Sequence, residues 1–282
     1  MFIKTSDLSY TYMKGTPFET DALFSVNVDI KEGQFVLIIG STGSGKSTLV
    51  QHFNALIKPQ CGKVYVLGKD ILSKEISFKK LRQEVGLAFQ FPESQIFEET
   101  IYADIAFGPR RAGLSEDEIS LRIEEYLKWI GITKEEANKR SPFTVSGGQM
   151  RKIALAGIMI MNPRVLILDE PTVSLDPKSS KEILERIKLL HNTKNITVII
   201  VSHDLKELIS HCDRILIMNK GRNVFFGDYS DLIKNRHVLK DSSLTLPDYT
   251  EILEYLSLNG IDIKKDAISE NECVKEILKH WN

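Results

Sequence analysis

The sequence predicts an α/β fold in which a buried parallel sheet is covered by helices. The apolar run 35–39 leads into a glycine-rich loop and then into a segment with helical character. Two further apolar runs, 165–168 and 197–201, end in charged or polar residues, as buried strands do when they carry side chains to the edge of a sheet. Such strands, alternating with helical segments, are typical of a parallel sheet with crossover helices.

The first part of the chain favours β structure. Residues 1–34 contain the alternating segment 25–30, which is followed by a turn into the apolar run. Tyr12 lies just before a loop at Gly15. An aromatic ring there can stack on a purine base, although a single tyrosine on a strand is more often half-buried packing.

Residues 40–47 match the phosphate-loop pattern G-x-x-x-x-G-K-[ST]. Its glycines let the backbone approach a ligand, so that successive N–H groups form a concave anion site. The following helix adds its positive end, Lys46 can reach the β- and γ-phosphates, and the Ser47 hydroxyl can ligate Mg²⁺. We expect this helix to end near Pro59. The loop consists of Gly40, Ser41, Thr42, Gly43, Ser44, Gly45, Lys46 and Ser47.

A helical insert is predicted after a short strand. Residues 85–90 indicate a strand that ends in Gln90. Between residues 100 and 140 no β pattern occurs, and apolar residues recur at helical spacing. Ser115 opens a helix with a capping-box pattern, and Gly131 ends it. The charged outer face of this helical subdomain is expected to be a solvated surface.

A second group of small residues opens a predicted helix that continues through residues 154–158. It consists of Ser146, Gly147, Gly148 and Gln149. Backbone N–H groups at a helix N-terminus attract anions, so this is a candidate for a second anion site. Ser-Gly-Gly is also a common turn, and the residues alone leave both interpretations open.

Two carboxylates follow the apolar run 165–168 directly. Asp169 and Glu170 would lie at the carboxyl edge of the sheet, where ligands bind in open α/β folds. An aspartate there can hold Mg²⁺ through water, and a neighbouring glutamate can orient and polarise an attacking water. The alternative is a helix N-cap, but the phosphate loop favours the metal and base roles.

His203 follows the next buried strand, 197–201. It falls at the same sheet edge as Glu170, one βαβ unit later. A histidine at a strand end is usually structural, but this position favours contact with a γ-phosphate.

Residues 229–282 form a tail with two predicted amphipathic helices. The first begins near Pro247 and ends at Gly260, and the second opens with a capping box at Ser269. Their apolar faces must be buried against the parent domain or another subunit. These faces carry Tyr249, Ile252, Leu253 and Leu256 in the first helix and Val274, Ile277, Leu278 and Trp281 in the second.

Composition limits the classes of partner. The 282 residues are 42% hydrophobic and 27% charged, and the formal net charge is −1, so no global field favours nucleic acid or an anionic membrane. The three cysteines show no disulfide or zinc spacing, and we expect all three to be small buried hydrophobes in a reducing compartment. No signal peptide and no run of roughly 20 apolar residues is found, so a membrane role would need a partner.

Ordered motifs resemble those of the ATP-binding-cassette ATPases. After the phosphate loop they are Gln90, Val145–Gln149, Leu168–Pro171, Ser174–Asp176 and His203. The resemblance covers residues 1–228 and implies a P-loop NTPase cassette, with a RecA-like parallel-sheet core, an antiparallel β subdomain and a helical subdomain at about 92–145. Val145 departs from the commoner leucine, which we expect to change packing and not the glycine contacts.

A narrower resemblance is to the ATPases of energy-coupling-factor (ECF) vitamin importers. It rests on residues 15–19, 91–100, 106–109 and 148–151, and the tail 229–282 is similar to that family's small α-rich C-terminal dimerisation domain. Within the family, the chain is more similar to the second of two paralogous ATPase subunits. This implies an ATP-hydrolysing translocase subunit that powers vitamin or micronutrient import by ATP-driven dimer closure.

The resemblance also implies partners. Two cassettes would sandwich two ATP molecules, so the partner would be a paralogous ATPase subunit, giving a heterodimer, or a second copy of this chain. The segment after Gln90 and the helical insert would receive the coupling helices of a transmembrane energy-coupling subunit, which pairs with membrane substrate-binding subunits. The chain would lie peripherally at the cytoplasmic face of the cell membrane, with no nucleic-acid partner.

Residue roles follow from the same resemblance. Tyr12 would stack on adenine, and Lys46 with the backbone from Thr42 to Thr48 would hold the phosphates. Ser47 and Gln90 would ligate Mg²⁺.

On the catalytic side, Asp169 would hold the metal through a bound water, Glu170 would be the general base, and His203 would hold the γ-phosphate. Gln90 would complete this catalytic set. The segment that serves the partner's ATP comprises Ser146, Gly147, Gly148 and Gln149.

Three alternatives remain open at this level. The ATPase of a cobalt or nickel importer shares most of these motifs. A non-transport cassette ATPase acting on DNA or ribosomes usually carries a coiled-coil insertion or a second cassette, and neither is present. A nucleotide-dependent switch without hydrolysis is disfavoured by Glu170 and His203.

Overall fold

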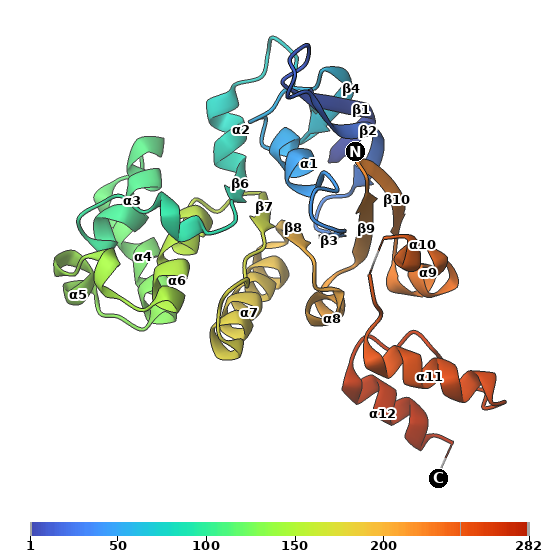
Figure 1. Ribbon diagram of the computed structural model, residues 1–282. Coiled ribbons are helices and arrows are strands. Elements are labelled where there is room, and N and C mark those ends of the chain that lie inside the picture. Colours follow the sequence, from blue (N-terminus) through green and yellow to red (C-terminus); the bar gives the residue numbers. More distant parts are fainter. Residues whose placement is uncertain (1, 243, 281–282) are drawn as a thin grey trace. The chain divides into compact units, whose positions relative to one another are not determined.

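The computed structural model describes residues 2–242 and 244–280 as two compact units (Figure 1). One unit comprises Met1–Lys74 together with Ile199–Asn282, and the other comprises Glu75–Val198. The α/β fold predicted from the sequence is confirmed, since parallel strands, antiparallel strands and helices are all present.

The first unit contains an antiparallel sheet with the strand order β2-β1-β4-β5. Ile3 of β1 pairs with Ile30 of β2 on one side and with Val66 of β4 on the other. The register shifts near Asp7 and Ser25, which both have positive φ. These strands are β1 (Ile3–Tyr12), β2 (Thr20–Ile30), β4 (Cys61–Val66) and β5 (Lys69–Asp70).

A second sheet in this unit runs in the order β10-β9-β3-β8. Strand β3 pairs with β9 in parallel, and β9 pairs with β10 in an antiparallel hairpin. All five residues of β3 are buried, as expected for a strand covered on both faces. The elements are β3 (Phe35–Ile39), α1 (Lys46–Phe53), β8 (Thr197–Ser202), β9 (Arg214–Asn219) and β10 (Arg222–Gly227).

The second unit combines two parallel strands with the predicted helical insert (Figure 1). Val85 of β6 (Val85–Ala88) pairs with Val165 of β7 (Val165–Asp169). Buried isoleucines line the inner face of the insert. The helices are α2 (Phe78–Glu84), η1 (Pro92–Gln95), α3 (Ile101–Ala112), α4 (Glu116–Ile130), α5 (Lys134–Lys139), η2 (Pro142–Thr144), α6 (Gly147–Met159) and α7 (Pro177–Lys194).

The chain ends in short helices with a small core of their own. Leu253, Ile263, Ala267 and Cys273 form this core, and α11 and α12 contact each other. The elements are α8 (Leu205–Leu208), η3 (Ile209–His211), α9 (Tyr229–Lys234), α10 (His237–Asp241), α11 (Asp248–Leu258) and α12 (Glu270–Leu278). None of the helices in the described ranges combines the length and the apolar character that a bilayer span requires.

Some local expectations were wrong. Helix α1 ends at Phe53, well before Pro59, because Ala55 adopts a positive φ of 52° that an α-helix cannot include. Cys61 is exposed, not buried, because it lies at the start of β4, where the first three residues are all exposed.

The apolar faces predicted for the tail are only partly covered. Leu253 is fully buried and Tyr249, Leu256 and Ile277 pack against the small core. Ile252 on α11, and Val274 and Leu278 on α12, are at least half exposed. Trp281 lies outside the described residues.

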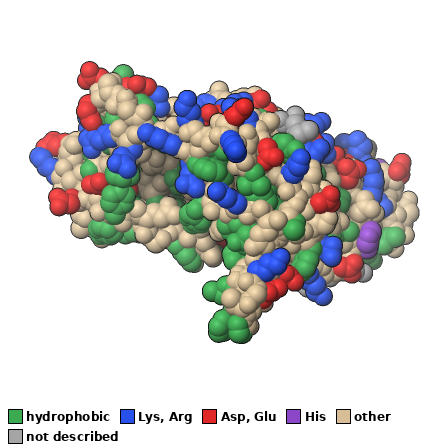
Figure 2. Space-filling model, turned by 90° about the horizontal axis from the view of Figure 1, so that it is seen from above, with side chains coloured by type: hydrophobic (Ala, Val, Ile, Leu, Met, Phe, Trp, Pro, Cys, Tyr) green, Lys and Arg blue, Asp and Glu red, His purple; other side chains and the backbone are tan. Residues whose placement is uncertain are grey.

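Charged side chains of both signs are mixed on the face seen in Figure 2, with hydrophobic groups scattered between them. This agrees with a formal net charge of −1, and on this face no extended surface of a single sign is seen.

Candidate nucleotide-binding and hydrolysis site

The phosphate loop connects the end of β3 to the first turn of α1 in the first unit. Gly43 and Gly45 have φ values of 78° and 97°, and Gly45 is the N-cap residue of α1. Lys46 is only 8% exposed, and its Nζ donates hydrogen bonds to the carbonyls of Gly40, at 2.7 Å, and Ser41, at 3.0 Å. The loop is therefore curled around its own lysine.

Two of the loop glycines are required by close backbone contacts. A Cβ on Gly40 would lie 2.2 Å from the carbonyl oxygen of Met218, and a Cβ on Gly45 would lie 2.5 Å from that of Ala22. The N–H of Gly221 donates to the Ser44 carbonyl at 3.1 Å. The loop is thus held between β2 and the β9–β10 turn, with no room for side chains at these points.

The outer side of the loop is open. Ser41, Thr42, Gly43 and Ser47 are exposed, and a Cβ on Gly43 would meet no atom within 4 Å. The Oγ of Ser44 is buried and makes no hydrogen bond within the described chain. An exposed glycine-rich turn at a helix N-terminus fits a phosphate group.

Tyr12 lies beside the loop helix. Its hydroxyl is 3.2 Å from the Oγ1 of Thr48, and its ring meets that of Tyr10 edge-on at 4.9 Å. Tyr10 in turn meets the buried His52, whose Nδ1 lies 2.8 Å from the carbonyl of Thr48. Burial lowers the pKa of His52, because the imidazolium form would lose its hydration. Tyr12 and the predicted phosphate site are therefore close together.

His203 also belongs to the first unit, as an exposed residue directly after β8. The next residue, Asp204, caps α8 through its side chain and donates its own N–H to the Oγ of Ser202 at 3.0 Å. These hydrogen bonds fix the backbone on the C-terminal side of His203.

The remaining predicted catalytic residues belong to the second unit. Gln90 is exposed two residues after β6, and the next residue, Phe91, has a φ of 59°. Asp169 ends β7 and is 7% exposed. Glu170 is half-buried with a φ of 50°. Left-handed backbone at non-glycine residues costs energy and is found most often at functional sites.

Ser146 begins α6 in the predicted way. Its side chain accepts a hydrogen bond from the N–H of Gln149, and the Gln149 side chain reaches back to the N–H of Ser146, which completes a capping box. A Cβ on Gly148 would lie 2.7 Å from the Oγ of Ser179, which donates to the carboxylate of Asp176 at 2.6 Å. Gly148 therefore allows α6 to approach the start of α7.

Comparison with known proteins identifies the family. The model for ABC transporters matches residues 23–173, more than half of the chain. The chain belongs to the ABC transporter family.

Relatives of this cassette are similar over its full length. It is 44% identical to the energy-coupling factor transporter ATP-binding protein EcfA2 of Clostridium tetani, covering 100% of this chain and 98% of that protein. The EcfA2 protein of Caldanaerobacter subterraneus is also 44% identical, with 99% and 98% covered. The cassette thus belongs to the ECF group of the family.

Solved structures support the same fold. The structure of cbiO1 from Clostridium perfringens, described as part of the ABC transporter complex cbiONQ, matches with a TM-score of 0.74 and 36% identity over 90% of this chain and 98% of that one. The cassette MJ0796, solved as a dimer with ADP and Pi, matches with a TM-score of 0.69 and 29% identity, over 80% and 98%. These similarities confirm the P-loop cassette architecture.

The donor atoms available in the cassette suit Mg²⁺. In the described ranges no three His, Cys, Asp or Glu side chains are grouped as a metal site. The predicted set instead offers the hydroxyl of Ser47, the amide oxygen of Gln90 and the carboxylate of Asp169. Oxygen ligands with few carboxylates are typical for a Mg²⁺ ion that is also held by substrate phosphates.

Sequence reasoning assigned no role to Arg151, which is buried in the second unit of the cassette. It is the largest fully buried side chain among the described residues, at 1% exposed. No signal in the sequence marks it, because the helix start 147–152 also carries glycines, a glutamine and a lysine. Its partners are also far away in the sequence.

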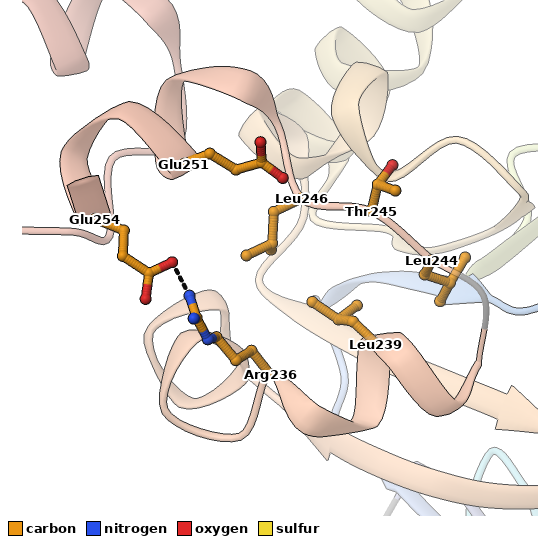
Figure 3. Close-up of a pocket in the computed structure, with 7 residues that line it drawn as sticks. All are labelled: Arg236, Leu239, Leu244, Thr245, Leu246, Glu251 and Glu254. Atoms are coloured by element: carbon orange, nitrogen blue, oxygen red, sulfur yellow. Dashed lines mark ion pairs between the residues drawn. The ribbon is translucent and has the colours of Figure 1, made fainter.

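A separate cavity of about 380 Å³ lies in the C-terminal part of the cassette. Figure 3 shows Arg236 and Glu254 pointing toward one another as an ion pair on one side, with Leu239 and Leu244 on the other. The lining contains none of the predicted nucleotide-site residues.

Proposed function

We propose that this cassette binds and hydrolyses ATP as the motor subunit of an ECF importer of vitamins or other micronutrients. The observation that carries this proposal is an open phosphate loop, curled around Lys46, in a chain similar over its whole length to ECF ATP-binding proteins. The proposed cycle is closure of two cassettes on ATP, followed by hydrolysis and opening.

Nucleotide binding is assigned to the first unit. The backbone from Thr42 to Thr48 donates to the phosphates, and Lys46 neutralises their charge. Tyr12 stacks on the adenine, since its hydroxyl contact with Thr48 keeps the ring near the loop helix.

The hydrolytic step is assigned to Glu170, which takes a proton from the attacking water, and to His203 and Gln90, which contact the γ-phosphate side. Bound Mg²⁺ would supply positive charge that neutralises the charge developing on the phosphate. Ser47, Gln90 and Asp169 would hold the metal, the last through water.

The second ATP contact comes from a partner cassette. Ser146, Gly147, Gly148 and Gln149 present the N-terminus of α6, which suits the γ-phosphate of an ATP bound to the partner.

Residues 229–282 serve as the dimerisation domain in this proposal. The large apolar side chains of α11 and α12 that remain at least half exposed are Ile252, Tyr255, Leu258, Val274 and Leu278. Exposed groups of this size on two neighbouring helices support contact with another subunit. The partner is a paralogous ATPase subunit, as the similarity to the EcfA2 proteins suggests, or a second copy.

The membrane partner would dock on the second unit. Phe97 and Phe107 are 59% and 40% exposed, and their rings meet edge-on at 4.8 Å. Exposed aromatic pairs are suited to a helix that packs into a groove. We assign this surface to the coupling helices of a transmembrane energy-coupling subunit, itself paired with substrate-binding subunits, so that the chain lies peripherally at the cytoplasmic face.

The decisive test is turnover by the complex co-purified with its membrane subunits. Glu170→Gln should lower kcat about 100-fold or more, because a general base typically contributes that much. The control is Glu185→Gln, at an exposed glutamate on α7, which should keep the parent rate. A parent complex without ATPase activity, or an unchanged rate in Glu170→Gln, would contradict the proposal.

The pairing is tested by light scattering of the Glu170→Gln chain with Mg·ATP. A stable dimer of the chain alone favours a homodimeric module, and a persistent monomer favours a paralogous partner.

A further inference from the structure

Arg151 is almost completely buried, so water has little access to its charge. It lies in the second turn of α6 and is 1% exposed. A buried guanidinium is tolerated only when its N–H groups are paired, so the identity of the partners shows what the residue holds in place.

One side of the guanidinium is bound to the segment that follows Gln90. Its Nε lies 2.5 Å from Oε2 of Glu93, and its Nη2 donates to Oε1 of the same carboxylate at 3.0 Å. Glu93 lies in η1. The ring of Phe91, whose backbone is left-handed, lies 5.7 Å from the guanidinium carbon. Arg151 thus holds both ends of the turn 91–93.

The other side is bound to the turn that follows Glu170. Nη1 donates to the carbonyl of Pro171 at 3.1 Å, and Nη2 lies 3.5 Å from the carbonyl of Val173. Glu170 and Ser174 in this turn both have positive φ. Backbone of this kind persists only where its surroundings over-determine it, and the guanidinium is one such constraint.

We propose that Arg151 is a positioning residue that couples the segment 91–95 to the orientation of Glu170. The inference rests on the proposed function, in which 91–95 belongs to the surface that receives a membrane subunit and Glu170 is the base. Movement of Glu93 changes the hydrogen bonds available to the Pro171 carbonyl, and so alters the direction in which the adjacent carboxylate points.

The planar fork of arginine is essential to this arrangement. Arginine can pair with a carboxylate and still direct other N–H groups at backbone carbonyls, whereas the lysine ammonium acts as a point charge. Arg151→Lys should therefore keep the charge opposite Glu93 but lose the simultaneous contact with Pro171.

The neighbouring Lys152 provides a matched control. It is also buried, at 7% exposed, and pairs with Glu182 on α7 while lying 5.8 Å from the Trp129 ring. Among the described residues, Lys152 makes no hydrogen bond or ion pair with the turn after Glu170, so breaking its pair tests general destabilisation alone.

The first experiment is hydrogen–deuterium exchange on the purified full chain. Glu93→Gln should raise the exchange rate of the peptide covering 170–176 about fivefold or more, through local opening. The matched variant Glu182→Gln should leave that peptide unchanged. The Val173 and Leu175 amides, which donate within the turn at 3.4 and 3.2 Å, report the change. Equal exchange in both variants would overturn the inference.

The second experiment measures ATP turnover by the assembled complex. Arg151→Lys and Glu93→Gln should each lower kcat about 10- to 100-fold, as expected for a misplaced catalytic group, with KM for ATP changed by less than about twofold. Lys152→Met and Glu182→Gln should keep the parent kcat per folded molecule.

Different results would contradict the coupling role of Arg151 and the proposed function. A parent complex with normal turnover and unchanged kcat in Arg151→Lys would overturn the coupling role while leaving the proposed function intact. A parent complex that does not hydrolyse ATP contradicts the proposed function and removes the basis of the coupling role.

Discussion

Lys46 in the phosphate loop and Arg151 in its cluster are both buried cations, but their surroundings are built in opposite ways. In the loop, Lys46 bonds to carbonyls five and six residues earlier in the chain. In the cluster, Arg151 bonds to Glu93 and Pro171, 58 and 20 residues away. One is a local structure that a short sequence pattern can encode, and the other exists only after distant segments have packed.

The comparison shows why one site was found from the sequence and the other was not. A local site leaves its backbone requirements as fixed residue types at fixed spacing. A distant site leaves only a single arginine and a single glutamate, which are indistinguishable in the sequence from surface residues.

The largest effect is expected from Gly40→Ala in the loop. The new Cβ would lie 2.2 Å from the Met218 carbonyl, so β3 and β9 would have to separate. We expect a loss of at least about 4 kcal/mol in the free energy of unfolding and no ATP binding, measured by urea titration and nucleotide titration.

Gly15→Ala is the control for Gly40→Ala. Gly15 also has a positive φ, of 79°, but no atom lies within 4 Å of its added Cβ. Gly15→Ala should lower the free energy of unfolding by only about 1–2 kcal/mol, from the left-handed backbone alone. Equal losses in the two variants would mean that close contact does not shape the loop.

The second prediction concerns stability at the distant cluster. Arg151→Ala should lower the free energy of unfolding by about 3–5 kcal/mol, because Glu93 would keep a charge that is 25% exposed and lacks its partner. Lys139→Ala, which breaks an exposed pair with Glu135, should cost less than about 1 kcal/mol. Chemical denaturation measures both, and similar values would remove the distinction between buried and surface pairs.

A smaller effect is expected at the start of α6. Ser146→Ala removes the hydroxyl that caps α6 by accepting the N–H of Gln149. It should lower the free energy of unfolding by about 1 kcal/mol, with a corresponding fall in the thermal midpoint. Ser146→Asn retains a capping side chain, so its free energy of unfolding should stay within about 0.3 kcal/mol of the parent value. If both variants match the parent, the cap contributes nothing to stability, and the residue is free to serve nucleotide contact alone.

The smallest effect is expected from His52, a buried residue of the loop helix α1. Burial lowers its folded-state pKa below the ordinary value of 6.5, so the unfolded chain binds a proton first as the pH falls. The contribution of neutral His52 to the free energy of unfolding is therefore fully present above pH 6.5 and decreases below it. Between pH 7.5 and pH 5.5, the midpoint of thermal unfolding should therefore fall less in His52→Gln than in the parent protein.

The exposed His237 offers the comparison for His52. His237→Gln should retain the parent difference between the two pH values. A parent-like difference in His52→Gln would show that this histidine is not part of the acid response.

The elements that sequence reasoning predicted well are those with strong local signals. Strand β3 and the first four residues of β7 are apolar runs, and Ser115 caps its helix as its spacing indicates. Element ends were less predictable. The end of α1 depends on the left-handed Ala55, and no residue type signals that in advance.

The predicted site residues divide in the same way. Tyr12 lies beside the phosphate-loop helix within one unit, whereas in the sequence it was linked to the nucleotide by the family resemblance. The left-handed backbone of Phe91 and Glu170 was not predictable, because neither residue type favours it.

The contacts of the phosphate loop also determine when the loop can form during synthesis of the chain. The carbonyl of Ser44 needs the N–H of Gly221, which follows Ser47 by 174 positions. At ribosomal speeds of about 5–20 residues per second, Gly221 is translated roughly 10 to 35 s after Ser47, so the loop cannot be complete before then. A nascent cassette therefore gains this support only when the β9–β10 turn leaves the ribosome, and nucleotide can stabilise the whole loop only from that moment.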